Sequence, residues 1–206
     1  MDAVNVLLLA MLFGLKHALD LDHVIAVSNI VSEKRKVRFS ALVGAWWGAG
    51  HMTTILVIGC AIIYFNLLIL KNVEKLLEGF VGVMFIVLGI QAVFSIYKRK
   101  SEVAVSKAKS PYMLKSFTVG LLHGLAGSSA VAYVFLSTIE DKSLVFLYLI
   151  LFGVGTLLSM VLATLIIGLP YSLASNHKRV NTVLACGTGF LSIGFGIFYI
   201  YEILMQ

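Results

Sequence analysis

The sequence predicts an all-α integral membrane protein in which six transmembrane helices form two inverted three-helix repeats. The first observation is composition: of 206 residues, 60% are hydrophobic and only 13% are charged, which is far more apolar than a soluble domain. The second is the presence of six apolar stretches that each approach or exceed the ~20 residues needed to cross a bilayer as a helix. The third is a set of short blocks that recur in the second half of the chain.

The six stretches take up most of the chain and leave no room for a soluble domain. Asp2 stands where a cleavable signal peptide would carry basic residues, so the first stretch is expected to remain as a span. In chain order the stretches are Ala3–Val31, Phe39–Phe65, Leu77–Tyr97, Leu114–Ile139, Leu144–Leu169 and Val183–Met205.

The recurring blocks predict the domain organisation. GLKHALDLDH at Gly14–His23 aligns with GLLHGLAGSS at Gly120–Ser129, and the rare residue His17 falls opposite His123. Because each repeat crosses the membrane three times, the second repeat has the opposite orientation in the membrane. Such inverted repeats are typical of secondary transporters, whose substrate site lies where the two halves meet. We expect a first repeat over residues 1–100, a basic linker over residues 101–112 and a second repeat over residues 113–206.

The distribution of positive charge predicts orientation. Twelve of the sixteen lysines and arginines lie in the segments that follow the first, third and fifth stretches, so the positive-inside rule makes these segments cytoplasmic and places both termini outside the cell membrane. The net charge of +6 is therefore read as a topology signal and not as a nucleic-acid surface. The lipid bilayer is the expected partner, and formation of a homo-oligomer stays open.

Four histidines and two aspartates lie inside the predicted spans, where each ionisable group costs about 2.5–3.5 kcal/mol. Imidazole is a ligand for Zn, Cu, Fe and Ni, and two carboxylates would neutralise a dication, so the set predicts a divalent metal site. The alternative is a polar network whose members only satisfy one another between helices. His177, which lies beside Lys178 and Arg179, is expected to be solvated. The predicted site residues are His17, Asp20, Asp22, His23, His51 and His123.

Spacing restricts the geometry of this site. At about 100° per residue, His17, Asp20 and His23 share one face of a regular helix while Asp22 points away. Either Asp22 has another partner, such as Lys16, or the helix is unwound between Leu19 and His23. The facing stretch of the second repeat is expected to be irregular too, and to offer carbonyl or hydroxyl ligands. The residues concerned are Gly124, Gly127, Ser128 and Ser129.

Three stretches resemble the nickel/cobalt transporter family. KHALDLDHVIAVSN (Lys16–Asn29) is similar to its HX4DH signature, WWGAGHMTTIL (Trp46–Leu56) to its glycine–histidine helix, and GLLHGLAGSSA (Gly120–Ala130) to its shorter, urease-accessory-like branch, within a wider group that includes sulfite exporters. The resemblance covers about a fifth of the chain. It implies that His17, Asp22 and His23 are essential for transport.

The sequence departs from the longer members of the family in three ways. Lys16 stands where they carry arginine, Ser28 stands where they carry a further aspartate, and they have extra helices. These differences affect the choice of metal more than the family assignment.

The predicted function is uptake of Ni²⁺, with Co²⁺ as the other candidate, by a permease that is not an enzyme and needs no cofactor beyond the transported ion. The chain has no GxxxxGK[ST] loop, so it cannot hydrolyse ATP unaided. Two alternatives stay open at this point: an intramembrane zinc hydrolase with three histidine ligands, and the membrane component of an ATP-driven metal importer.

Overall fold

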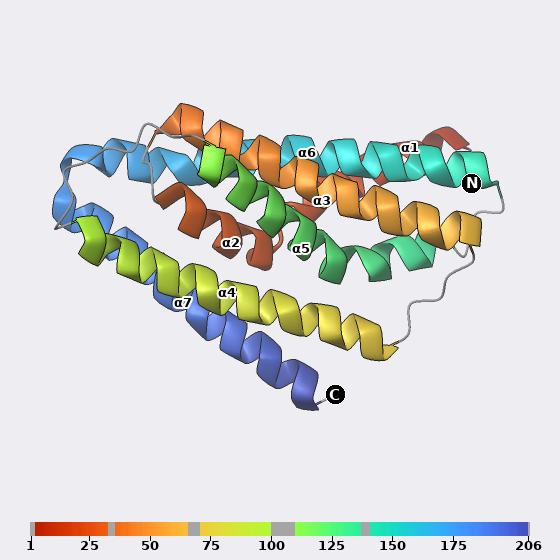
Figure 1. Cartoon of the computed structure of the whole chain (residues 1–206). Helices are drawn as coiled ribbons and strands as arrows, with labels where there is room; N and C mark the ends of the chain where they lie inside the picture. The colour runs from red at the N-terminus through yellow and green to blue at the C-terminus, as the bar shows by residue number, and fades with distance from the viewer. Residues whose placement is uncertain (1–2, 33–35, 66–70, 100–109, 137–140, 206) are drawn as a thin grey trace.

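The computed structural model describes residues 3–32, 36–65, 71–99, 110–136 and 141–205, and these residues are almost entirely helical (Figure 1). No strand occurs among them. The elements are α1 (Ala3–His17), α2 (Leu21–Ser32), α3 (Val37–Phe65), α4 (Lys71–Arg99), α5 (Ser110–Leu136), α6 (Lys142–Leu173), the short 3₁₀ helix η1 (Ala174–Asn176) and α7 (Lys178–Met205).

The structure confirms an all-α protein with several long apolar helices. Within the described residues α3, α4, α6 and α7 are each long and apolar enough to cross a bilayer, and the bent pair of α1 and α2 makes a fifth span. Helix α5 coincides with the fourth predicted stretch but is not among these five, so the count of six spans stays a prediction. Most of the predicted linker lies outside the described residues.

Most helices extend beyond the apolar stretches that predicted them, because hydrophobicity marks the membrane segment and not the helix end. Helix α6 begins two residues before its apolar stretch, where the Asp141 side chain caps it by accepting from the Ser143 N–H at 2.8 Å. It ends at Leu173 shortly after Pro170, which cannot donate a backbone hydrogen bond. Pro111 lies in the first turn of α5, where its missing N–H costs nothing.

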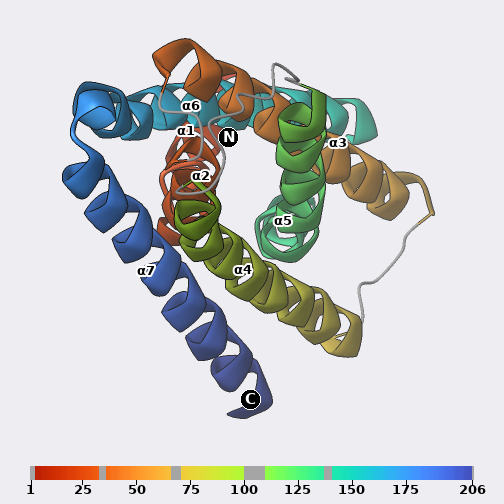
Figure 2. The ribbon, with the colours of Figure 1, turned by 60° about the vertical axis from the view of Figure 1, so that its left-hand side comes forward.

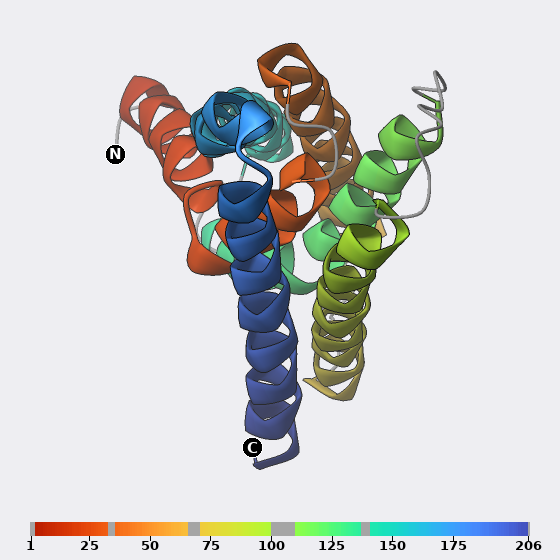
Figure 3. The same cartoon turned by 90° about the vertical axis from the view of Figure 1, so that its left-hand side faces the viewer.

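The helices form two groups. Helix α3 packs against both α5 and α6, and α1 packs along α6. Helices α4 and α7 pair with each other, and Figures 2 and 3 show the amino-terminal end of α4 and the carboxyl-terminal end of α7 extending away from the rest of the bundle. Helix α2 touches α3, α4, α6 and α7, so this short helix lies between the two groups.

Glycine lets the backbones of the first group approach closely. A Cβ atom on Gly14 of α1 would meet the Phe152 carbonyl oxygen of α6, and one on Gly120 of α5 would meet the Trp47 carbonyl oxygen of α3. Small residues at such crossings replace the hydrophobic driving force that helices lack in lipid. The two glycines therefore fix α1 on α6 and α5 on α3.

Hydroxyl groups join the same two helix pairs. The Thr54 hydroxyl of α3 donates to the Leu121 carbonyl of α5 at 3.0 Å, and the Ser159 hydroxyl of α6 donates to the Leu15 carbonyl of α1 at 2.7 Å. Interhelical hydrogen bonds of this kind contribute about 0.6 kcal/mol each on average in membrane proteins. Leu15 and Leu121 lie two residues before His17 and His123, so these bonds help to place both histidines.

Candidate metal centre

The first span is broken where the ionisable residues lie. Helix α1 ends at His17, α2 begins at Leu21, and their axes differ by 53°. The expected break is confirmed, but it lies earlier than the predicted interval between Leu19 and His23, since His23 is helical. The reason is Asp20, whose carbonyl accepts the first hydrogen bond of α2 from the Val24 N–H at 3.2 Å; aspartate is favoured at such an N-terminal position.

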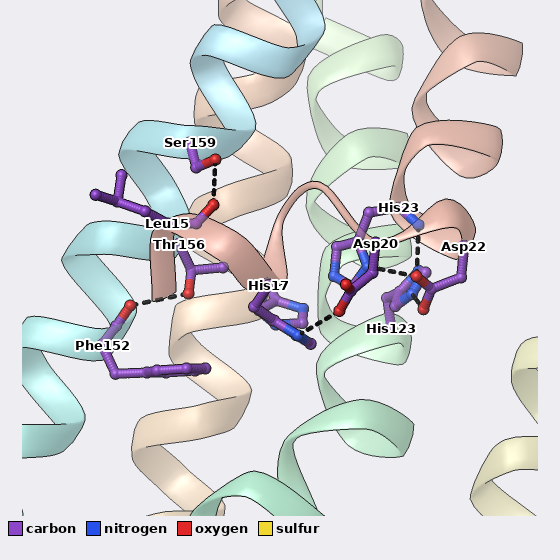
Figure 4. A network of polar contacts seen from close by, with 10 residues as sticks. Leu15, His17, Asp20, Asp22, His23, His123, Phe152, Thr156 and Ser159 are labelled. Carbon is purple, nitrogen blue, oxygen red and sulfur yellow. Dashed lines mark hydrogen bonds and ion pairs between the residues drawn. The ribbon is translucent and has the colours of Figure 1, made fainter. Parts of the chain in front are cut away.

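The break places Asp22 in the first turn of α2, where its negative charge interacts favourably with the helix dipole. Its Oδ1 accepts from the backbone N–H of His23 at 2.9 Å and also lies 2.9 Å from His23 Nδ1. Its Oδ2 lies 2.8 Å from Nε2 of His123 on α5. Asp22 therefore bridges α2 and α5, as Figure 4 shows, and its partners are these two histidines instead of Lys16.

A second carboxylate holds His17. Asp20 Oδ2 lies 3.2 Å from His17 Nδ1, and the Asp20 side chain is 51% exposed. Because an ionised carboxylate only accepts hydrogen bonds, His17 and His23 each carry their hydrogen on Nδ1 and keep a lone pair on Nε2. Carboxylates orient metal-binding histidines in this way in many proteins.

Three imidazoles converge on one side of the break. Nε2 of His17 lies 3.2 Å from Nε2 of His51 on α3. The centre of the His23 ring lies 4.6 Å from the centre of the His17 ring and 5.2 Å from that of the His51 ring. One nitrogen from each of the three lies within 4.8 Å of the others. Two donors at ~2.1 Å from one ion lie about 3 to 4.2 Å apart, so this set of three can hold a divalent metal with little movement.

A second set of three shares His23. One atom each from Asp22, His23 and His123 also lie within 4.8 Å of one another. Five of the six predicted ionisable site residues thus come together in the two sets. The sixth, Asp20, contacts His17 from the more exposed side. His177 lies at the surface, as expected.

Several ring nitrogens of the cluster are buried with no hydrogen-bond partner among the described residues: His23 Nε2, His51 Nδ1 and His123 Nδ1. The three side chains are at most 1% exposed. A buried polar atom without a partner costs about 1–3 kcal/mol, so a network that existed only to satisfy its own members would not leave these atoms unpaired.

Aromatic rings pack around the histidines of the cluster. Trp47 lies 5.3 Å from the His23 ring and 5.9 Å from the His123 ring, Phe85 lies 5.8 Å from His123, and Phe152 lies 5.7 Å from His17. Electrostatic interactions are stronger in such a largely buried environment than in water. A bound cation would therefore interact strongly with the Asp22 carboxylate.

The irregular backbone predicted opposite the break is not found. Helix α5 is α-helical through Gly124–Ser129, and a Cβ atom on Gly124 would lie 3.0 Å from the His51 carbonyl oxygen. The glycine serves the close approach of α5 to α3 instead of opening the helix. The side chains of Gly127, Ser128 and Ser129 lie outside the described part of the chain, so their contribution to the site stays a prediction.

Comparison with known proteins gives one relative of nearly full length. The chain is 36% identical to urease accessory protein UreH of Bacillus sp. (strain TB-90) over an alignment of 212 positions. The alignment covers 98% of this chain and 93% of the relative. No family model and no solved structure matches the chain.

Proposed function

Since the chain belongs to the nickel/cobalt transporter family, as a full-length relative of urease accessory protein UreH, we propose that it takes up Ni²⁺ across the cytoplasmic membrane as a secondary transporter. The observation that carries the proposal is the buried cluster of four histidines and Asp22 at a broken transmembrane span. Broken helices at the substrate site are typical of secondary transporters. Imidazole is a good ligand for nickel.

Nickel is the first candidate among divalent ions because the chain belongs to the nickel/cobalt transporter family and imidazole is a good ligand for nickel. Co²⁺ remains the second candidate. The affinity of a nitrogen site follows the same order of metals regardless of its biological role, so uptake must be measured with both ions in competition. The relation to sulfite exporters stays a prediction.

The membrane potential is a sufficient energy source for this transport. A potential of 100 mV is worth about 2.3 kcal/mol per elementary charge, and thus about 4.6 kcal/mol for a dication. Each 1.4 kcal/mol is a factor of ten, so a potential that is negative inside concentrates the ion more than about a thousandfold. In the proposed orientation both termini lie outside.

The two halves form inverted repeats in this proposal, and matching contacts support it. Three contacts between the halves each have a counterpart in which both residues are shifted by 105 or 106 positions. The close approach of Gly14 to the Phe152 carbonyl corresponds to that of Gly120 to the Trp47 carbonyl, and the approach of Gly50 to the Phe117 carbonyl corresponds to that of Gly155 to the Met11 carbonyl. The hydrogen bond from Thr54 to the Leu121 carbonyl corresponds to the one from Ser159 to the Leu15 carbonyl. Alternating access then follows from rocking of one half against the other.

The test is uptake of radioactive Ni²⁺ by the purified protein in liposomes, with a potassium diffusion potential of about −100 mV inside and no ATP. We expect accumulation that depends on the potential, is absent from empty liposomes and is lost in His23→Ala. Uptake that requires ATP and a partner protein would favour the importer component. Tight metal binding with no uptake under any potential would contradict the proposal.

A further inference from the structure

We propose that the cluster offers two alternative positions to one divalent ion, and that the two positions share His23. The first position is formed by His17, His23 and His51, and the second by Asp22, His23 and His123. This inference rests on the proposed transport function and adds the path that the ion takes within the site.

The five side chains form two sets because of their spacing. Within each set the donor atoms lie within 4.8 Å of one another, and the two sets overlap only in His23. Two donors bound to one ion at ~2.1 Å cannot be more than about 4.2 Å apart. An ion that binds one set therefore cannot also take all members of the other without movement of the helices.

The two nitrogens of His23 define the two positions. Nδ1 faces the Asp22 carboxylate at 2.9 Å, whereas Nε2 is buried and has no partner among the described residues. In the first position the ion binds Nε2, and Nδ1 keeps its hydrogen and donates it to Asp22. In the second position the ion replaces that hydrogen at Nδ1, and Nε2 carries the single N–H. The ring stays neutral in both cases.

Only one ion occupies the cluster at a time. A neutral imidazole has one lone pair, so His23 cannot bind ions at both nitrogens unless it loses its second hydrogen as well. Two dications held a few ångströms apart in a largely buried site also repel each other strongly. The second position lies beside the Asp22 carboxylate, which balances part of the charge of the ion there.

The helices that supply the ligands give the two positions different roles. His17, His23 and His51 come from α1, α2 and α3, all in the first half of the chain. The second position needs His123 of α5, which is the one contribution from the second half. Because α1 packs on α6 and α5 packs on α3, movement of one packed pair against the other separates His17 from His51, while His123 stays with His51. Such a movement favours passage of the ion from the first position to the second.

The test compares Ni²⁺ binding and uptake for His51→Ala, His123→Ala and the double variant, with His177→Ala at the exposed histidine as a control. The wild type and the control should bind one ion per chain. Each single variant should still bind one ion, with affinity reduced about 10- to 100-fold, as is usual when support for a metal is lost. The double variant should show no saturable binding, and both single variants should lose uptake.

X-ray absorption at the nickel edge counts the imidazole ligands of the bound ion and so checks which position it occupies. The ion should have three imidazole ligands in His123→Ala and two in His51→Ala. Variants that do not elute as folded protein are replaced by the glutamine forms. The inference is overturned if the wild type binds two ions at once, if either single variant binds as poorly as the double variant, or if His123→Ala transports normally. If the wild type binds in the expected pattern but transports nothing, the proposed function fails and the two positions stand.

Discussion

Replacement of Asp22 by asparagine tests the central carboxylate, because the substitution keeps the size of the side chain and removes its charge. Asp22 Oδ1 accepts from His23, and Oδ2 contacts His123 Nε2 at 2.8 Å. Asparagine supplies one oxygen and one NH₂ group, so at least one imidazole N–H faces a donor instead of an acceptor. One hydrogen bond to a charged group is lost, which is worth about 1.5–3 kcal/mol.

That free energy corresponds to a loss of about 10- to 100-fold in Ni²⁺ affinity, the same range that is found when the hydrogen-bond partners of metal-binding histidines are removed. Asp20→Asn is the matched control. The Asp20 side chain is 51% exposed and lies 3.2 Å from His17 Nδ1, and an exposed pair of this kind contributes about 0–1 kcal/mol. The expected loss for the control is therefore about fivefold or less.

The assay is titration calorimetry of the purified variants with Ni²⁺, followed by initial rates of uptake in liposomes. Circular dichroism and the thermal midpoint verify that both variants are folded. The reasoning is refuted if Asp22→Asn binds Ni²⁺ within threefold of the wild type, or if Asp20→Asn has the larger effect. Either result would mean that Asp22 does not hold the two histidines for the metal.

Two further predictions concern the fold and its orientation. Gly14→Ala and Gly120→Ala should each lower the stability of the protein in detergent by about 1–3 kcal/mol, because the added methyl group meets a carbonyl oxygen of the neighbouring helix. Gly187→Ala, whose methyl group meets nothing within 4 Å, should not lower the thermal midpoint, since alanine is the better helix former. Equal midpoints for all three variants would argue against the close helix crossings. In a background without Cys60 and Cys186, a cysteine at Ser101 should react with an impermeant thiol reagent only from the cytoplasm, and one at Lys142 only from outside. The reverse labelling pattern would invert the proposed topology.

The sequence predicted the break in the first span because a regular helix could not bring Asp22 to the face of His17. The predicted break lies too late in the chain, because Asp20 was considered only as a site residue. In the structure Asp20 is also the residue before the first turn of α2. Aspartate followed by an apolar turn is a signal for a helix start, and this signal could have located the break.

The contact between Asp22 and His123 could not be read from the sequence, since the two residues are 101 positions apart and only the packing of α5 brings them together. The glycines of α5 were misread for a related reason. Glycine occurs both where a helix opens and where two helices approach closely, and only the partner helix distinguishes the two cases. Here Gly124 lies against the His51 backbone on α3, so its role is close packing.

The most direct test of the metal site is the position of the ion itself, determined by anomalous X-ray diffraction at the nickel edge from crystals grown with Ni²⁺. We predict one ion per chain within ~2.2 Å of a ring nitrogen of His23, with its other protein ligands drawn either from His17 and His51 or from Asp22 and His123. An ion that lies more than ~3 Å from both nitrogens of His23 would contradict the account, since no coordinate bond to nitrogen is that long.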